Sequence, residues 1–383
     1  MFNFKIYNKI SSIDANQWNK CAGNSNPFLS YIFFKNLEDS NSIGENTSWV
    51  PNYISVILKN DIVAFVPLFI KLDSQGEYVF DHSWANAFYN AGGNYYPKIQ
   101  SSVPFTPVSG NRILIKEGLD KKLTKKIIIS AGNYIEKLVD KNNFSSAHIT
   151  FCTFEEQSSL SQLNFLPRIG EQYHWQNNNY KTFNNFLDSL SSRKRKAINK
   201  ERNFIKNSNV NILSKTGEQI SDLDLENMYN FYIDTSNKKW GRAYLNKEFF
   251  KLLNDNFRNK ILLIFAEQSS NIIAGAMHII GKDTLYGRYW GCINEIKYLH
   301  FELCYYQAIE WAIKHKKKYV EGGAQGPHKI QRGYLPVKTF SSHYISNISF
   351  RDAVKKYLKE EEEIISNDIA LINKKYSPFK NKN

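Results

Sequence analysis

The sequence predicts an α+β protein made of two similar domains with mixed central sheets. In each half of the 383-residue chain, a helix pair is followed by consecutive strands, another helix and a further strand. No close sequence repeat accompanies this repeated order, which indicates a duplicated domain. The length is sufficient for two domains of ordinary size. We expect residues 1–170 to form the first domain and 171–355 the second, with 356–383 as a charged helix and tail.

The first half follows this order from the amino terminus. Residues 13–22 and 29–39 predict two short helices, the second capped by Asn26 or Ser30. Three strand-like segments, YISVILKN, DIVAFVPLFIKL and EYVFDHSW, come next. WANAFYNAGG predicts a helix that ends at glycine. A proline-broken edge strand, an amphipathic helix and a final strand follow, in SSVPFTPVSGNRILI, LTKKIIISAGNYIEKLVDK and SSAHITFCTF.

The second half repeats the plan. Residues 183–206 predict one long helix that is apolar at its start and strongly basic afterwards. The strand NVNILS and the helices LDLENMYNFYIDTSNKKW and NKEFFKLLNDNF come next. KILLIFAEQ, NIIAGAMHIIG and TLYGRYWGC predict three consecutive strands. FELCYYQAIEWAIKHKKK predicts a helix with one apolar face, and KKYVEGG predicts the strand after it.

The composition restricts the partners and the compartment. Lys and Arg number 50 against 36 Asp and Glu, a net charge of +14. Such a balance suits a nucleic acid, an anionic lipid or a phosphorylated partner, although an AT-rich genome, whose codons favour Lys, Asn, Ile and Tyr, would also produce it. The four cysteines form no CxxC pair, so we expect neither a metal site nor a disulfide framework. Without a signal peptide or a transmembrane segment, we expect a cytoplasmic protein.

Several segments between about residue 18 and residue 350 resemble a known family. They are NPFLSYIFFKNLEDS, SQGEYVFDHSWANAFYNAGGNYYPK, VPFTPVSGNRIL, SSRKRKAINKER, DTSNKKWGRAYL, DTLYGRYWG, LHFELCYYQAIEWAI and EGGAQGPHKIQRGYLP. Together they resemble the FemAB-like predicted N-acyltransferases, formerly a domain of unknown function, which are related to the Fem-type peptidyltransferases. The resemblance implies two tandem GNAT-like domains, the fold of the acyl-CoA N-acyltransferases.

The resemblance also implies a reaction. An activated acyl or aminoacyl group would pass to an amine by direct attack, on a small molecule or on a cell-envelope precursor of the peptidoglycan type. No tightly bound cofactor is implied, and the co-substrate would be an acyl-CoA or an aminoacyl-tRNA. Residues 291–301 stand where GNAT enzymes carry a Gln/Arg-x-x-Gly-x-Gly phosphate loop and lack that pattern, which favours tRNA.

Two alternatives stay open. An acyl-CoA-dependent N-acyltransferase acting on a small molecule, a lipid or a protein needs the same fold. The second alternative is a non-catalytic module that binds RNA or an envelope precursor, since fold does not establish function.

The segment EGGAQGPHKIQRGYLP is the first candidate site. Its glycines permit backbone angles that other residues avoid, and we expect them to place Gln325 and His328 at a substrate. Lys329 and Arg332 are one helical turn apart and could neutralise an anion together. In Fem-type relatives a Lys at the matching position lies near the transferred acyl group, and the resemblance carries that role to Lys329. The alternative is a turn with surface charges.

The strand and helix before that segment supply further candidates. Arg288 and Tyr289 lie in an aromatic-rich strand, and a charge there either pairs with a buried acid or faces a ligand. Glu302 either satisfies the helix dipole or handles a substrate proton. His300 is a candidate general base or a simple loop histidine.

In the first half, Glu77, Asp81 and Trp84 form a cluster after a strand. Carboxylates beside an indole suit an amine-bearing acceptor, and a buried polar turn is the alternative reading. Trp240, in the polar and aromatic loop IDTSNKKWGR, is a further candidate for binding substrate.

The basic part of helix 183–206 is a candidate nucleic-acid site. Its candidate contacts are Arg193, Lys194, Lys196 and Lys200. Spacing by three and four residues places several of these cations on one helical face, where they could contact tRNA phosphates. The alternative is a solvated helix face.

Overall fold

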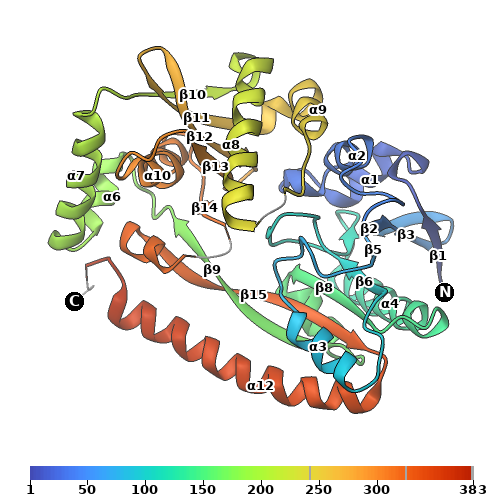
Figure 1. Cartoon of the computed structure of the whole chain (residues 1–383). Coiled ribbons are helices and arrows are strands. Elements are labelled where there is room, and N and C mark those ends of the chain that lie inside the picture. The colour runs from blue at the N-terminus through green and yellow to red at the C-terminus, as the bar shows by residue number, and fades with distance from the viewer. Residues whose placement is uncertain (241–242, 324–325, 381–383) are drawn as a thin grey trace. The chain divides into compact units, whose positions relative to one another are not determined.

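The chain forms two compact units (Figure 1). The structure, a computed structural model, describes residues 1–240, 243–323 and 326–380, and the side chains of 239 and 240 lie outside that description. The first unit comprises Met1–Glu171 and Lys338–Asn367, and the second comprises Gln172–Val337 and Asp368–Asn383. The boundaries therefore fall within β9 (Leu166–Gln176), β15 (Tyr334–Ile345) and α12 (Ile348–Leu371).

The grouping of Lys338–Asn367 with the first unit differs from the linear division expected from the sequence. The carboxyl-terminal part of β15 pairs antiparallel with β8 (Ser146–Cys152). Val354 and Leu358 of α12 then pack in a core with Trp84 and Tyr95. Strand pairing and apolar burial thus bring a late segment of the chain back into the first unit.

The first unit carries two sheets, ordered β1-β3-β4-β7 and β2-β5-β6-β8-β15. Within the second of these, β6 and β8 are parallel, whereas the other neighbours are antiparallel. The elements not yet defined are β1 Phe2–Tyr7, η1 Ile10–Ser12, α1 Ala15–Ala22, η2 Pro27–Leu29, α2 Tyr31–Asp39, β2 Trp49–Pro51, β3 Tyr53–Leu58, β4 Asp61–Val66, β5 Phe69–Lys71, α3 His82–Asn90, β6 Lys98–Ser101, β7 Leu114–Ile115, α4 Lys121–Lys141 and α5 Phe154–Leu160.

The helices of this unit follow their sequence signals. Asp120 caps α4, and Ile127, Ala131 and Ile135 recur at a spacing of four, which buries one face of the helix against the sheets. Thr153 and Glu156 form a reciprocal capping box at the start of α5.

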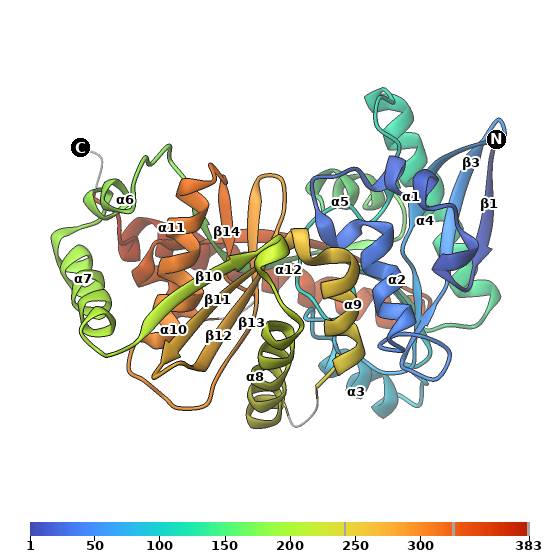
Figure 2. The ribbon, with the colours of Figure 1, turned by 90° about the horizontal axis from the view of Figure 1, so that it is seen from above.

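The second unit holds one sheet, ordered β10-β11-β12-β13-β14-β9, in which only β13 and β14 of the described strands are parallel. In Figure 2, α8 lies on one face of this sheet and α10 and α11 lie on the other. The elements are α6 Phe183–Ser189, α7 Ser192–Lys206, β10 Asn211–Thr216, η3 Gly217–Gln219, α8 Asp222–Trp240, α9 Lys247–Phe257, η4 Arg258–Lys260, β11 Ile261–Gln268, β12 Asn271–Ile280, β13 Thr284–Cys292, α10 Leu299–Phe301, the π-helix η5 Glu302–Tyr306, α11 Gln307–Lys314, β14 Tyr319–Glu321, the 3-10 helix η6 Pro327–Arg332 and the π-helix η7 Ile372–Tyr376.

Two predicted strands of the first half are corrected. The single strand expected over 61–72 is two strands, β4 and β5, separated at Pro67, which cannot donate a backbone hydrogen bond. The strand expected over 77–84 is absent. Its residues form a turn and the start of α3, because Glu77 and Asp81 bond to a buried lysine rather than to a neighbouring strand.

The long helix expected over 183–206 is also interrupted. It divides into α6 and α7 at Leu190, which is extended and fully buried. The backbone N–H of Ser191 donates to the carbonyl of Pro378 at 2.9 Å, so the tail takes a bond that a continuous helix would need. The helix expected over 301–318 changes to a π-helix at 302–306 and ends at Lys314.

Within the described part of the chain, no helix combines the length and the apolar character that crossing a membrane requires.

Gly291 of β13 offers a direct test of the helix–sheet packing. A Cβ atom there would lie 2.3 Å from the carbonyl oxygen of Phe231 in α8, and a backbone atom cannot move aside cheaply. We expect Gly291→Ala to lower the free energy of unfolding by about 1–3 kcal/mol in a denaturant titration. Asn294→Ala, in the exposed loop that follows, should change it by less than about 0.5 kcal/mol. Equal stability of both variants and the native protein would contradict this packing.

Candidate active site

Lys329 lies in η6, directly after the last strand of the second unit's parallel pair. Gly326 (φ 121°) and Gly333 (φ 90°) bracket η6 in backbone conformations that favour glycine. Gly322 leaves room for the lysine, because a Cβ atom at 322 would lie 3.3 Å from Cδ and Cε of Lys329. The Lys329 ammonium donates to the carbonyl of Gly323 at 3.1 Å, and the residue is only 2% exposed.

Burial changes the acid–base character of Lys329. It lowers the pKa of the amine to about 8; the nearby Cys304 opposes this shift and Arg288 adds to it. A lysine with such a pKa gives and takes a proton close to neutral pH.

Arg288 of β13 pairs with a buried acid, the first of the two outcomes left open above. Its Nη2 lies 3.4 Å from Oε2 of Glu321 in β14, and its Nη1 donates to the carbonyl of Gly287 at 2.8 Å. His174 of β9 lies 3.9 Å from the other oxygen of Glu321. Burial, together with Arg288 and Lys329, lowers the pKa of His174, although Glu321 opposes the shift. Three neighbouring strands therefore contribute one buried polar group.

The two candidate histidines share an aromatic cluster. The Nε2 of His328 lies 2.9 Å from the hydroxyl of Tyr305, and the rings of His300 and His328 are 6.2 Å apart. His300 also packs edge-on against Trp290, at 5.1 Å between centroids. Tyr289 points elsewhere, since its ring packs with Tyr232 of α8 at 4.9 Å.

Glu302 and Arg332 are bound to other charged groups. Glu302 accepts from Arg202 at 2.9 Å and from Gln307 at 2.8 Å, and Arg332 donates to Glu201 at 2.8 Å. These two residues and Lys329 therefore bond to different partners. Gln325 lies outside the described residues, and so does the side chain of Trp240.

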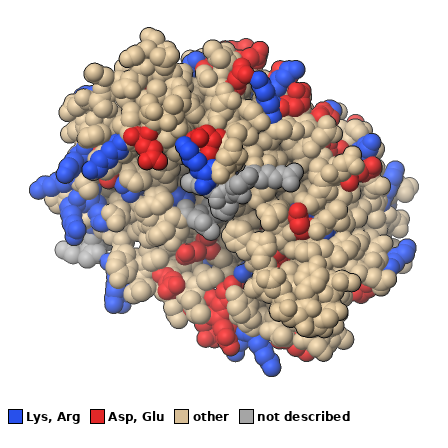
Figure 3. All heavy atoms as spheres, in the orientation of Figure 1, with Lys and Arg blue, Asp and Glu red and all other residues tan. Residues whose placement is uncertain are grey.

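The candidate nucleic-acid residues divide by exposure. Arg193, Lys196 and Lys200 are exposed on α7, whereas Lys194 is half-buried. Figure 3 shows Lys and Arg side chains gathered at the left of the molecule, where α7 lies in Figure 1. A helical spacing of three and four continues this stripe to Phe204, which is 45% exposed and packs edge-on against Tyr298 at 5.6 Å.

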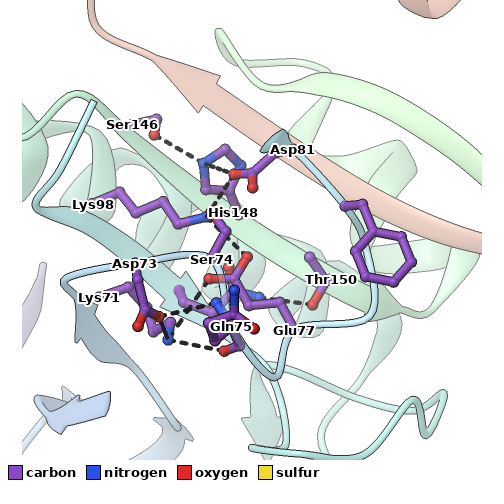
Figure 4. Close-up of polar contacts among 12 residues, drawn as sticks. Lys71, Asp73, Ser74, Gln75, Glu77, Asp81, Lys98, Ser146, His148 and Thr150 are labelled. Carbon is purple, nitrogen blue, oxygen red and sulfur yellow. Dashed lines mark hydrogen bonds and ion pairs between the residues drawn. The ribbon is translucent and has the colours of Figure 1, made fainter. Parts of the chain in front are cut away.

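The first unit holds a second buried polar group, centred on Lys98 of β6 (Figure 4). The Lys98 ammonium donates to Glu77 at 2.8 Å, to Asp81 at 2.5 Å and to Ser74 at 2.8 Å, and it is fully buried. Glu77 and Asp81 therefore already surround a cation of the protein. The sequence analysis did not select Lys98, although a lysine opening a short strand after Pro97 was a usable signal.

Each carboxyl of this group has a different acidity. Burial raises the pKa of Glu77 to about 7, against the opposing attraction of Lys98. Burial acts in the same direction on Asp81, but the charge and hydrogen bond of Lys98 outweigh it and hold the pKa of Asp81 well below its usual range. Glu77 is thus the proton-accepting member of the pair.

Two histidines extend the group across the sheet. The Nδ1 atoms of His148 in β8 and His343 in β15 are 2.7 Å apart, and Nε2 of His148 lies 2.8 Å from the Ser146 hydroxyl. Burial lowers the pKa of His148 to about 3, so the ring is neutral at physiological pH. Trp84, another candidate, packs edge-on against His343 at 5.0 Å. A polar residue in the apolar strand SAHITFC was the available signal for His148.

The two polar groups occupy matching places in their sheets. Gln100, His148 and His343 stand opposite one another on β6, β8 and β15. In the second unit, Tyr286, Glu321 and His174 stand opposite one another on β13, β14 and β9. In both units a parallel pair is followed by an antiparallel neighbour, so the duplication expected from the element order extends to the location of the buried polar residues.

The family model described as peptidoglycan biosynthesis/recognition, FemAB-like, matches residues 9–381. The chain belongs to the FemAB-like family. This confirms the resemblance stated from the sequence segments. A search of curated protein sequences found no match.

Solved structures agree with the FemAB-like assignment at the level of fold. The crystal structure of FemX is 9% identical, covers 92% of this chain and 100% of its own, and has a TM-score of 0.54. The C-terminal domain of a putative lysylphosphatidylglycerol synthetase from Agrobacterium fabrum is 7% identical, with coverages of 95% and 98% and a TM-score of 0.53. A tandem GNAT protein from the clavulanic acid pathway is 7% identical, with coverages of 91% and 99% and a TM-score of 0.47. The predicted α+β class, with two units and mixed sheets, is confirmed.

Glu77 supplies a pH test of the Lys98 group. Because the pKa of Glu77 is raised to about 7 in the fold, its contribution to stability is complete below its unfolded pKa and is lost as the pH rises through about 7. Gln resembles the protonated form at every pH. We therefore expect Glu77→Gln to become less destabilising, relative to the native protein, between pH 5 and pH 7.5 in denaturant titrations. Asp61→Asn, at an exposed carboxylate, is the control and should show little change. A cost that grows with pH would contradict the raised pKa.

Proposed function

We propose that this FemAB-like protein is an acyltransferase that moves an aminoacyl group from aminoacyl-tRNA to an amine of a cell-envelope precursor. The buried Lys329 with its lowered pKa is the observation that carries the proposal. The family description, peptidoglycan biosynthesis/recognition, supports an envelope precursor as the acceptor. The fold shared with FemX supports transfer chemistry by analogy.

The proposed reaction proceeds without a covalent enzyme intermediate. The acceptor nitrogen attacks the ester carbonyl carbon, and a C–N bond forms as negative charge develops on the carbonyl oxygen. The ammonium of Lys329 stabilises that oxyanion. The ester C–O bond then breaks, the proton lost by the amine ends on the leaving ribose oxygen, and the products are an amide and a free hydroxyl. Lys329, with a pKa of about 8, is suited to relay that proton.

The exposed stripe on α7 supports a nucleic-acid donor. Arg193, Lys196 and Lys200 place three cations along one helix face, and the exposed ring of Phe204 continues the same face. Cations that follow a phosphate backbone, next to an aromatic ring on which a base can stack, are the elements of single-strand recognition. A solvated face needs no exposed phenylalanine. The 3′ end of tRNA, where the aminoacyl ester is attached, is single-stranded and fits such a surface.

An acyl-CoA donor is the second candidate, because the tandem GNAT-like fold suits it equally well. Calorimetric titration separates the two donors. Binding of tRNA that weakens steeply with salt supports the proposal, whereas tight and salt-insensitive binding of coenzyme A would replace it.

The role of Lys329 is tested by substitution. We expect Lys329→Met to lower kcat for transfer from aminoacyl-tRNA to a peptidoglycan precursor by about 10²–10³-fold, the usual cost of removing one oxyanion donor. The native rate should decline as the pH rises through about 8, because the ammonium deprotonates there. Lys329→Arg retains the charge and should remove this decline. Lys282→Met, at an exposed lysine of the same unit, serves as the control. Full turnover by Lys329→Met would refute the role.

The donor surface is tested by binding. We expect Lys196→Gln with Lys200→Gln to weaken tRNA binding and to reduce the slope of log affinity against log salt by about 1 per lost contact. Phe204→Ala should weaken binding to a single-stranded CCA-ended oligonucleotide by about 1–3 kcal/mol with the salt slope unchanged. Lys206→Gln, exposed on the same helix but off the stripe, is the control. If all four substitutions acted alike, the stripe would not be the binding surface.

A further inference from the structure

Helix α7 presents different chemistry on its two sides. Its exposed side carries the cations described above, whereas Ile198 and Ile205 are buried in the core of the second unit. Two adjacent residues of opposite charge, Glu201 and Arg202, also face partners within that unit. Their bonds lead to the segments that carry Lys329 and Glu302.

Glu201 connects α7 to η6 through Arg332. Its carboxylate accepts from Nη2 of Arg332 at 2.8 and 2.9 Å, and it also accepts from the hydroxyl of Tyr306. The same guanidinium donates through Nη1 to the carbonyl of His328 at 2.9 Å and lies 3.4 Å from the ring centroid of Phe301. The carbonyl of His328 belongs to the peptide bond that leads into Lys329. The Glu201–Arg332 pair therefore holds the backbone immediately before the proposed catalytic lysine.

Arg202 connects α7 to the π-helix η5, and it does so with a charge opposite to that of Glu201. Its Nη2 donates to Glu302 at 2.9 Å and its Nε lies 3.2 Å from the same oxygen. Its other partner, Glu310, is half-exposed. Glu302 is 3% exposed and also accepts from Gln307, so its charge depends on these donors.

The Glu201–Arg332 and Arg202–Glu302 ion pairs determine which segment packs against which residue of α7, in addition to any contribution to stability. A buried ion pair is often no more stabilising than apolar residues of the same size, yet breaking one partner leaves a buried charge without compensation. Glu201 points its charge toward η6 and Arg202 points the opposite charge toward the π-helix. Exchanging the two segments would bring like charges together, so the crossed pairs define one arrangement.

We propose that Glu201 and Arg202 are positioning residues that hold η6 and the π-helix against α7 and thereby place the Lys329 side chain. This inference rests on the proposed function, because the position of Lys329 matters for turnover only if Lys329 takes part in the reaction. The same helix then carries the donor stripe on one side and the ties to the catalytic segment on the other.

The test follows Lys329 itself. Competitive labelling with acetic anhydride over a range of pH, read by mass spectrometry, reports the titration of each lysine in the full chain. In the native protein Lys329 should titrate near pH 8. Glu201→Gln keeps the size of the side chain and removes its charge, so η6 should loosen and Lys329 should titrate closer to the ordinary lysine range near pH 10.4. Turnover should fall by about tenfold or more, mostly in kcat, as expected for a displaced catalytic group.

Two further variants keep the test decisive. Glu310→Gln removes the half-exposed partner of Arg202 and should alter neither the titration of Lys329 nor turnover. Arg202→Lys keeps the charge but loses the forked geometry, and it should shift the titration of Lys329 in the same direction as Glu201→Gln if the latter fails to fold. An unchanged titration of Lys329 in folded Glu201→Gln or in folded Arg202→Lys would overturn the inference. If the titration shifts while Lys329→Met retains turnover, the positioning stands and the proposed function fails.

Discussion

The pairing of two adjacent parallel strands in each unit is the constraint on which the rest of the structure depends. Such strands require a long crossover, here α4 between β6 and β8, and α10 to α11 between β13 and β14. The crossover covers one face of the sheet, and polar residues on the paired strands are then enclosed. Every buried charge must find a partner there, since an unpaired one costs several kcal/mol. In the Lys98 group and in the Arg288–Glu321 pair, each buried charge has a partner of opposite charge.

The two units solve the same problem with different chemistry. The first surrounds a lysine with two carboxylates and adds a pair of neutral histidines, so its charges are compensated internally. The second pairs Arg288 with Glu321 and keeps Lys329 buried against a backbone carbonyl, at the cost of a lowered pKa. A buried amine with a lowered pKa can exchange a proton near neutral pH, whereas an amine between two carboxylates is held in its charged form. This difference is why the proposed chemistry lies in the second unit.

Much of the fold was predictable because it depends on local periodicity. Helices α4, α8 and α9 and strands β11 to β13 follow from apolar spacing and from caps close in sequence. Pro67 is a local reason for the split between β4 and β5, whereas two other failures arose because long-range partners outweighed the local pattern. Glu77 and Asp81 bond to Lys98, and their segment does not form the expected strand. Leu190 pairs with the carboxyl-terminal tail, and the expected helix is interrupted there. Neither partner can be located from the segment alone.

For the candidate site, the sequence by itself determined which residues are unusual: glycines around Lys329, an arginine in an aromatic strand, and cations at helical spacing. Residue type and spacing are local properties, so they can be identified directly in the sequence. Only the tertiary structure decided that Arg288 meets Glu321, that Arg332 and Glu302 bond to α7, and that Lys329 is buried enough to lower its pKa. Partner choice and desolvation depend on which distant segments enclose a side chain, and a linear sequence does not contain that information in readable form.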